Sequence, residues 1–196
     1  MAVISDEYKA LIRENHEEWA KGAKPWGQSA RRNLGDRMRE FIIRRPGIKT
    51  ILDYGCGQRT LEKYIMEENP IPGRVLEWYN YDPGLPEFEK VPEVKNGHFD
   101  LVTSCDVLEH IEPDQIDSVI EHMHKLTKHY QYHCISCDPC RSKLPDGSNA
   151  HLIVETPKWW KDKFTDPQKG TIMLWNHEEI LRRKDIRTNC YIQIDR

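Results

Sequence analysis

The sequence predicts a three-layer α/β fold, in which helices cover both faces of a mostly parallel sheet, with a helical arm before it. Segments typical of strands and of helices alternate between residues 50 and 137. The first of these strands runs directly into a turn that contains Gly55 and Gly57, as at the ligand-binding turns of α/β proteins. We therefore expect a helical arm or lid over residues 1–47 and one domain over residues 48–196.

Length and composition fit one globular domain. The chain has 196 residues, of which 38% are hydrophobic and 31% are charged, which argues against a disordered chain. It contains no stretch of 18 apolar residues, so we expect no membrane span. The N-terminal segment lacks the basic and apolar pattern of a secretory signal, so we expect a cytoplasmic protein. The net charge of −3 gives no general argument for nucleic acid.

The cysteines are expected to be reduced thiols, because disulfides are rare in the cytosol. Three of the six form a C-x-x-C-x-x-C run, namely Cys134, Cys137 and Cys140. Such a run offers metal ligands, but no second C-x-x-C pair follows it to complete a zinc tetrahedron. We interpret the run as the end of a strand that carries thiols.

Two amphipathic helices are predicted in the arm. Apolar residues fall near helical spacing from Tyr8 to Trp19, and more regularly from Leu34 to Ile42. Glycine and proline separate the two segments, and Pro46 follows the second. The second segment is rich in arginine, which suits either an anionic acceptor such as nucleic acid or a phosphorylated sugar, or a solvated helix face.

Beyond the arm, the pattern predicts strands over residues 49–54, 74–81, 99–105, 130–137, 171–175 and 188–194. It predicts helices over residues 60–68, 113–128 and 157–164, and a short helix from about Asn176. Residues 138–150, which contain two prolines and a glycine, are predicted to form a loop.

Three of the predicted strands end in residues that suit a ligand, and their carboxyl ends share the edge where open α/β sheets bind ligands. The first ends in Asp53, just before glycines that let the backbone approach a ligand closely. The second ends in Asp82, a carboxylate that is able to accept both hydroxyl hydrogens of a ribose. The third ends in the segment from Cys105 to His110.

A dinucleotide-binding turn is the first alternative at this edge. Its fingerprint, G-x-G-x-x-G, would need glycine at the position of Thr60, and Arg59 beside it is not glycine either. The incomplete loop serves a pyrophosphate poorly, whereas a ligand without phosphates is not excluded.

Three segments, ILDYGCG, YDPGLPEF and FDLVTSCDVLEHIEPDQI, follow in this order. Together they resemble the class I S-adenosylmethionine-dependent methyltransferases, and most closely a compact group found in phages and bacteria that also carries a segment like LPDGSNAHLIVETPKWW. The resemblance covers nearly the whole chain from residue 48 and implies a Rossmann-like fold. Two departures stand out. Arg59 replaces the usual third glycine, and the short stretch between Asp82 and Phe99 implies that a strand and a helix are reduced or missing.

The resemblance implies S-adenosylmethionine as cofactor and direct methyl transfer to an acceptor, for which we expect a hydroxyl. The acceptor class, small molecule or nucleic acid, and the oligomeric state stay open. The alternatives are an inactive S-adenosylmethionine-binding protein and a nucleotide-binding enzyme on a similar fold. The implied contacts are the methionine part at Asp53, Gly55, Cys56 and Gly57, the ribose at Asp82, the adenine beside Pro83 and Gly84, and the sulfonium end at Asp106, Val107 and Leu108.

A divalent metal is also predicted, held by Asp106, Glu109, His110 and His151. The D-x-x-E-H spacing brings the carboxylates to one side of a helical turn, and oxygen and imidazole ligands together suit magnesium, manganese or zinc. The block also resembles the E-x-x-E-H of metal-dependent 2′-O-methyltransferases of small RNAs and of ubiquinone-pathway O-methyltransferases. There the metal binds acceptor hydroxyls. Without a metal, His110 and His151 are candidates for acid–base roles in catalysis. The structural alternative is that Glu109 and His110 cap the following helix and that His151 is a loop histidine.

Overall fold

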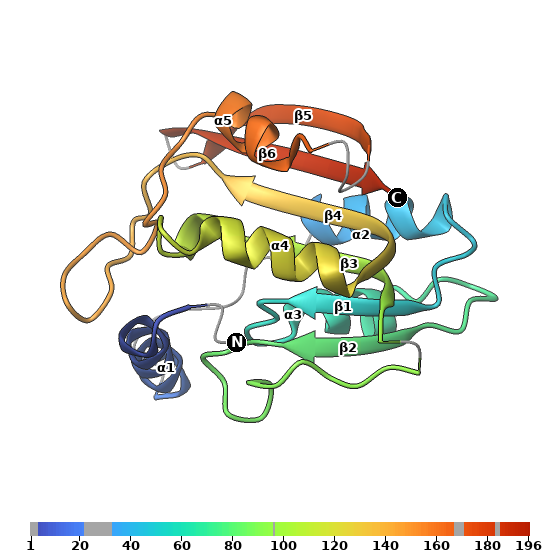
Figure 1. Ribbon diagram of the computed structural model, residues 1–196, viewed down its shortest axis with the longest axis horizontal. Coiled ribbons are helices and arrows are strands. Elements are labelled where there is room, and N and C mark those ends of the chain that lie inside the picture. Colours follow the sequence, from blue (N-terminus) through green and yellow to red (C-terminus); the bar gives the residue numbers. More distant parts are fainter. Residues whose placement is uncertain (1–3, 22–32, 96, 167–170, 183–184) are drawn as a thin grey trace.

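The computed structural model describes residues 4–21, 33–95, 97–166, 171–182 and 185–196. Its described strands form one six-stranded sheet in the order β2-β1-β3-β4-β6-β5 (Figure 1). The first four strands in this order pair in parallel, whereas β6 pairs antiparallel with both β4 and β5. This confirms the predicted α/β class with a mostly parallel sheet. The strands are β1 (Thr50–Tyr54), β2 (Glu77–Tyr81), β3 (Phe99–Cys105), β4 (Thr127–Ser136), β5 (Thr171–Arg182) and β6 (Asp185–Asp195).

Helices lie on both faces of this sheet and at one edge (Figure 1). They are α1 (Asp6–Ala20), α2 (Asn33–Ile43), α3 (Thr60–Glu62), which continues as the π-helix η1 (Lys63–Glu68), the 3₁₀ turn η2 (Leu108–His110), α4 (Ile116–Leu126) and α5 (Pro157–Phe164). The start of α5 is well specified, because Thr156 accepts a hydrogen bond from the backbone of Trp159 and Pro157 occupies the first turn. None of the described helices is long and apolar enough to cross a membrane.

The C-terminal part differs from the sequence prediction. The predicted short helix from about Asn176 does not form, because β5 continues through this segment and pairs with β6 over its whole length. Asn176, for example, lies opposite Tyr191 in the antiparallel register. Backbone pairing with a neighbouring strand outweighs the local preference of a short segment, since strand formation depends on tertiary context.

The segment that follows β2 is short, as its length in the sequence suggested. Between Asp82 and Phe99 the described residues form turns, with neither a helix nor a strand. The chain therefore passes directly from the end of β2 back to the start of β3.

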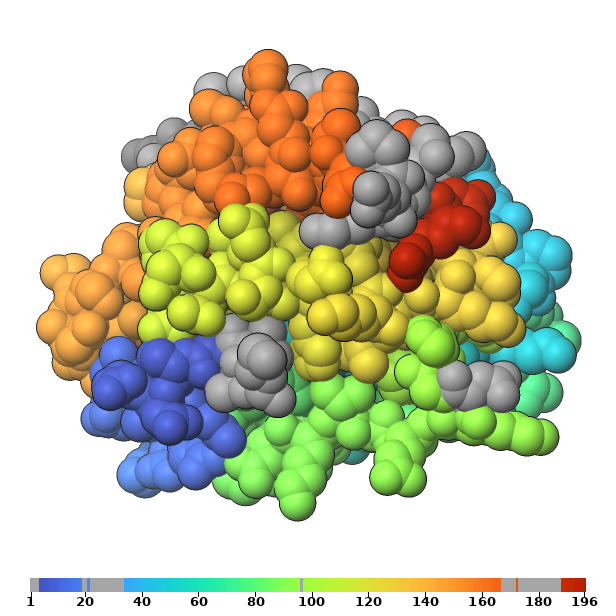
Figure 2. All heavy atoms as spheres, viewed as in Figure 1, coloured from blue at the N-terminus to red at the C-terminus, as the bar shows by residue number. Residues whose placement is uncertain are grey.

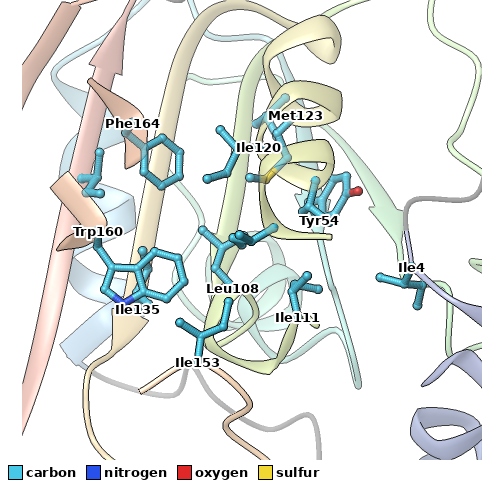
Figure 3. Close-up of a cluster of buried hydrophobic side chains, with 14 of the residues drawn as sticks. Ile4, Tyr54, Leu108, Ile111, Ile120, Met123, Ile135, Ile153, Trp160 and Phe164 are labelled. Carbon is cyan, nitrogen blue, oxygen red and sulfur yellow. The ribbon is translucent and has the colours of Figure 1, made fainter. Parts of the chain in front are cut away.

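Two hydrophobic clusters fix the sheet between its helical layers. One lies between the sheet and α4 and α5, where Leu108, Ile135 and Trp160 are fully buried (Figure 3). The other lies on the opposite face and includes Met38 and Ile42 of α2. Helix α2 therefore belongs to the layer behind the sheet, whereas α1 lies at the carboxyl edge of the parallel strands (Figure 1). The parallel pairing of β1 with β2 and with β3 brings the carboxyl ends of these strands together.

Candidate functional site

The turn after β1 has a backbone that requires glycine. Gly55 has φ 80°, and a Cβ placed there would lie 2.5 Å from the side chain of Val107. Arg59, which stands at the position of the usual third glycine, also adopts a left-handed conformation, with φ 58°. Its Nε donates to Glu62 Oε2 at 2.6 Å. The replacement of glycine by arginine therefore leaves the shape of the turn in place.

Asp82 joins the end of β2 to this turn. Its Oδ2 accepts the backbone N–H of Gly57 at 3.0 Å, and its Oδ1 accepts that of Gly84 at 2.9 Å. Nε2 of His16, from α1, lies 3.8 Å from Asp82 Oδ2. Burial raises the pKa of Asp82, and the nearby His16 and the two backbone N–H groups partly offset this. The remaining lone pairs of the carboxylate suit hydroxyl donors.

Asp53, the last acidic residue of β1, is buried beside two other carboxyl groups. Burial raises its pKa to about 8, and the neighbouring Glu62 and Asp82 contribute in the same direction. A positively charged ligand group near Asp53 would favour the ionised carboxylate over the neutral one. The site therefore suits an ammonium group. Cys56 in the turn is buried, with Sγ 3.8 Å from the carbonyl oxygen of Gly57.

The end of β3 turns sharply at Asp106, whose φ is 56°. Its backbone N–H donates to the carbonyl of Cys134 at 3.0 Å. Strain of this kind in a residue other than glycine is concentrated at functional sites. Val107 then packs against Gly55, and Leu108 is fully buried in the cluster under α4 (Figure 3). The side chain of Leu108 therefore belongs to the core, and only its backbone is available at the carboxyl edge.

Three of the four predicted metal ligands come together at the same edge. One ligand atom each from Glu109, His110 and His151 lies within 4.8 Å of the others. Asp106, the fourth predicted ligand, is not a member of this group; its residue has a left-handed backbone and precedes η2. It is near enough for its charge to raise the pKa of Glu109.

Backbone carbonyls orient both imidazole rings. Nδ1 of His110 donates to the carbonyl of Ala150 at 2.7 Å, and Nδ1 of His151 donates to that of Asp138 at 2.5 Å. Since a carbonyl only accepts, the proton is on Nδ1 in each case, and in a neutral ring Nε2 carries the lone pair. Burial and the nearby His151 lower the pKa of His110 to about 3, so His110 is neutral at pH 7. Metal-binding histidines show this arrangement.

Glu109 is fully buried and only half satisfied. Its Oε1 accepts the backbone N–H of Ser136 at 2.7 Å, whereas Oε2 has no hydrogen-bond partner within the described part of the chain. Burial and the charge of Asp106 raise its pKa to about 8, and His151 offsets part of this. An unsatisfied buried acceptor costs roughly 1–3 kcal/mol, and more for a charged group. The orphaned oxygen therefore indicates a place for a ligand.

Helix α1 lies beside this edge, at the lower left of Figures 1 and 2. Ser5 donates from its backbone and its hydroxyl to Glu112, at 2.8 and 2.6 Å. The hydroxyl of Tyr8 donates to the carbonyl of His110. Further along the helix, Lys9 and Arg13 pair with Glu89, and His16 approaches Asp82 as described above. The helix thus links the η2 side of the edge to the β2 side.

The arginines near α2 are engaged within the chain where the structure describes them. Arg37 lies over the ring of Tyr191, Arg39 donates to the carbonyl of Asn69, Arg44 pairs with Glu40 and Arg45 lies over Phe41. Arg31 and Arg32 are outside the described residues. These contacts favour the interpretation of the arginine-rich segment as a helix surface over an anion site at the carboxyl edge.

Two residues at this edge were not predicted from the sequence. His16 reaches Asp82 from α1, and His151 acts on the thiol of Cys140: burial raises the pKa of that thiol, but the interaction with His151 helps to lower it below its usual value. The C-x-x-C-x-x-C run contained a signal for Cys140, but its spacing does not show which thiol approaches a histidine. His16 carried no motif, because its position depends on how α1 docks.

Comparisons with known proteins agree with the fold. A family model described as a methyltransferase domain matches residues 26–182. The structure is similar to 1,6-didemethyltoxoflavin-N1-methyltransferase from Burkholderia thailandensis with bound 1,6-didemethyltoxoflavin and S-adenosylhomocysteine. The TM-score is 0.67 at 14% identity, covering 96% of this chain and 88% of that chain.

Two further structures resemble this one. Magnesium protoporphyrin IX methyltransferase from Synechocystis, with bound SAH, gives a TM-score of 0.60 at 10% identity, over 97% of this chain and 98% of that chain. The N-methyltransferase NodS from Bradyrhizobium japonicum, in complex with S-adenosylhomocysteine, gives 0.54 at 12% identity, over 94% and 98%. At such identities the likeness concerns the fold alone. The curated proteins contain no match to this chain.

Proposed function

This chain belongs to the class I S-adenosylmethionine-dependent methyltransferases, and we propose that it methylates an acceptor hydroxyl held beside a divalent metal. The observation that carries this proposal is the convergence of Glu109, His110 and His151 at the carboxyl edge of the sheet. Oxygen and nitrogen ligands of this kind suit magnesium, manganese or zinc. Such a metal lowers the pKa of a hydroxyl and orients it.

The cofactor site is proposed at the ends of β1, β2 and β3, with the roles inferred from the sequence. Asp53 would hold the ammonium group, which is supported by its burial among carboxyl groups. Asp82 would accept the ribose hydroxyls through the lone pairs not used by Gly57 and Gly84. Asp106 would lie at the sulfonium end, where the cofactor supplies a methyl group that is already activated.

The protein's own contribution is mainly positional. Holding two reactants in line accounts for a large part of such a rate acceleration. The turn at Gly55, closed by Val107, fixes the floor of the site, and the backbone carbonyls behind His110 and His151 fix the two rings.

The acid–base alternative for the two histidines is less well supported. Burial lowers the pKa of His151, but the hydrogen bond with Cys140 and the charge of Glu109 outweigh it and raise the pKa to about 9. In the metal-free protein His151 therefore holds its proton near pH 7, and a metal ion would have to displace that proton to bind the ring. His110, with its pKa near 3, is a weak base. His110, which is neutral at pH 7, fits a metal ligand better than a general base, and His151 joins it as a ligand only in its deprotonated form.

Transfer of a labelled methyl group from S-adenosylmethionine to lysate fractions tests this function. Small-molecule and nucleic-acid fractions are assayed separately, in EDTA and after adding back manganese, magnesium or zinc. We expect metal-dependent transfer to an oxygen in one fraction. Full turnover in EDTA, without any effect of added metal, would exclude a role for the metal. A labelled methyl group on a nitrogen atom would exclude a hydroxyl as the acceptor. Cofactor binding without any transfer would favour an inactive binding protein.

Helix α1 is proposed to act as a lid that also contacts the acceptor. The support is its path across the edge, from Tyr8 at His110 to His16 at Asp82. Deleting residues 1–30 is expected to weaken S-adenosylhomocysteine binding and to reduce turnover, because it exposes the edge to water. Calorimetry and the transfer assay measure the two effects. A deletion that leaves both unchanged would exclude the lid.

Cofactor affinity is expected to depend on pH through Asp53. In the free protein the pKa of Asp53 is about 8, so this carboxyl is neutral near pH 6.5. The ammonium group of the cofactor favours the carboxylate, so binding releases a proton below pH 8. Affinity should then rise with pH, by up to about tenfold per unit, and level off above pH 8.

Calorimetry of S-adenosylhomocysteine binding in two buffers of different ionisation enthalpy counts the protons released. The Asp53→Asn variant is the control, since it has no carboxyl to titrate and should release fewer protons. Proton release that is the same in the parent and in Asp53→Asn would show that Asp53 does not face the ammonium.

A further inference from the structure

We propose that His16 of helix α1 is part of the cofactor site and donates a hydrogen bond to a ribose hydroxyl that Asp82 also holds. The inference rests on the cofactor site of the proposed function and adds to it a side chain from the proposed lid. The observation that carries it is the gap between the two residues. Nε2 of His16 lies 3.8 Å from Oδ2 of Asp82, and both side chains are buried.

This gap suits a shared hydroxyl better than a direct contact. A hydrogen bond from nitrogen to oxygen spans about 2.7–3.2 Å, so the two side chains do not bond each other. A hydroxyl is able to donate to one group and to accept from the other, so it would join the carboxylate to the imidazole. Each oxygen of Asp82 accepts one backbone N–H, from Gly57 or Gly84, and keeps a lone pair for such a donor.

Gln58, in the turn after β1, sets the orientation of the imidazole ring. Its side-chain Nε2 lies 3.4 Å from Nδ1 of His16. An amide nitrogen only donates, so Nδ1 accepts, and the proton of the neutral ring is on Nε2, which faces Asp82. Burial lowers the pKa of His16, although the charges of Asp82 and Glu87 offset part of this, so the ring is neutral at pH 7. His16 therefore presents an N–H donor to the site and carries no charge.

The same ring lies against the glycine beside which the adenine is proposed. A Cβ placed on Gly84 would lie 3.1 Å from Cδ2 of His16 and 3.3 Å from Cδ1 of Ile12. Two side chains of α1 thus pack on the turn after β2, and one of them also reaches the carboxylate proposed for the ribose. His16 is 6% exposed and Asp82 is 7% exposed, so little water competes for a hydrogen bond between them. This position fits a contact to the adenosine part of the cofactor.

Variants of α1 separate a hydrogen bond from packing. His16→Phe keeps an aromatic ring and removes the donor, and His16→Ala gives the same comparison without a ring. His16→Gln keeps an N–H donor on a flexible side chain. Ile12→Ala is the matched control, because Ile12 packs on the same glycine and has no polar group in its side chain. It loosens the lid without removing a hydrogen bond.

Calorimetry with S-adenosylhomocysteine and with its 2′-deoxy and 3′-deoxy analogues tests the contact. We expect the parent to bind one of the analogues about thirtyfold more weakly or worse, because Asp82 and His16 then lack their shared partner. In His16→Phe and His16→Ala this ratio should fall by about two- to tenfold, since one of the two hydrogen bonds is already absent. His16→Gln should keep part of the ratio. Ile12→Ala should weaken both ligands equally and keep the ratio of the parent.

The outcomes distinguish this contact from the cofactor site as a whole. A ratio in His16→Phe and His16→Ala equal to that of the parent, for both analogues, overturns the contact and leaves the cofactor site in place. An equal fall of the ratio in Ile12→Ala reports a loosened lid and also overturns it. A parent that binds S-adenosylhomocysteine and both analogues equally well removes the ribose from Asp82 and His16 alike. A parent that does not bind S-adenosylhomocysteine rejects the cofactor site and the contact together.

Discussion

An Asp82→Ala variant is expected to bind S-adenosylhomocysteine about ten- to hundredfold more weakly than the parent, because it loses charged hydrogen bonds that are worth about 1.5–3 kcal/mol. The carboxylate also accepts the N–H group of Gly57, in the turn after β1, and that of Gly84, in the turn after β2, and so anchors both turns. The variant therefore loses a direct contact and the support of the loop that holds the rest of the cofactor. Calorimetry at fixed pH measures the change.

Asp100 offers a matched control at the opposite edge of the sheet. Its Oδ2 accepts the N–H groups of Lys49 and Thr50 at 2.8 and 3.0 Å, so it anchors backbone as Asp82 does, and both residues are 7% exposed. Asp100→Ala should lower the stability of the fold and leave affinity unchanged at temperatures where it is folded. Equal weakening by the two variants, or parent-like binding by Asp82→Ala, would place the ribose elsewhere.

A Glu109→Gln variant is expected to lose metal binding by about a hundredfold or more, together with metal-dependent methyl transfer. Removal of an outer partner of a metal ligand already costs ten- to a hundredfold, and Glu109 is a proposed ligand itself. The cofactor site does not include Glu109, so S-adenosylhomocysteine binding should remain. Cobalt titration and calorimetry on one preparation measure the two effects.

The same substitution should make the metal-free protein less sensitive to alkaline pH. The pKa of Glu109 is raised to about 8 in the folded state, whereas a glutamate in an unfolded chain ionises near 4.3. The unfolded state therefore loses its proton first, and the contribution of Glu109 to stability falls as pH rises from about 4.3 to 8. Glutamine has no proton to lose, so the free energy of unfolding of the variant should not decrease in this way.

Denaturant unfolding in EDTA at pH 5 and pH 8.5 compares the two proteins. Glu93→Gln, which removes a carboxylate from an exposed residue, is the control for net charge and should follow the parent. If Glu109→Gln loses as much stability as the parent between the two pH values, the carboxyl is not the strained group that its burial implies.

Local patterns in the sequence were sufficient to predict the parallel part of the fold. The parallel strands β1 and β3 are short, mostly apolar runs, Asp53 stands near the end of β1 and Asp82 directly follows β2, and such signals need no long-range information. The topology then brings strand ends together at one edge. For this reason Glu109 and His110, which directly follow β3, were predicted to lie at the same edge as Asp53.

The remaining features depend on contacts between distant residues. The approach of Cys140 to His151 depends on Asn149, whose Oδ1 accepts the backbone N–H groups of both residues, and that of His16 to Asp82 depends on the docking of α1. Asp106 does not join Glu109, His110 and His151, because the helical turn that the D-x-x-E-H spacing predicted begins only at Leu108. The strand through Asn176 likewise forms because β6 lies beside it.

Backbone amide hydrogen exchange of the whole chain, with and without S-adenosylhomocysteine, is the decisive measurement for the cofactor site. We expect slower exchange in the bound state at residues 55–59, 82–85 and 106–110, and unchanged exchange at residues 49 and 50, beside Asp100. Slowing confined to other segments, or no slowing at saturating ligand, would contradict a cofactor site at the carboxyl ends of β1, β2 and β3.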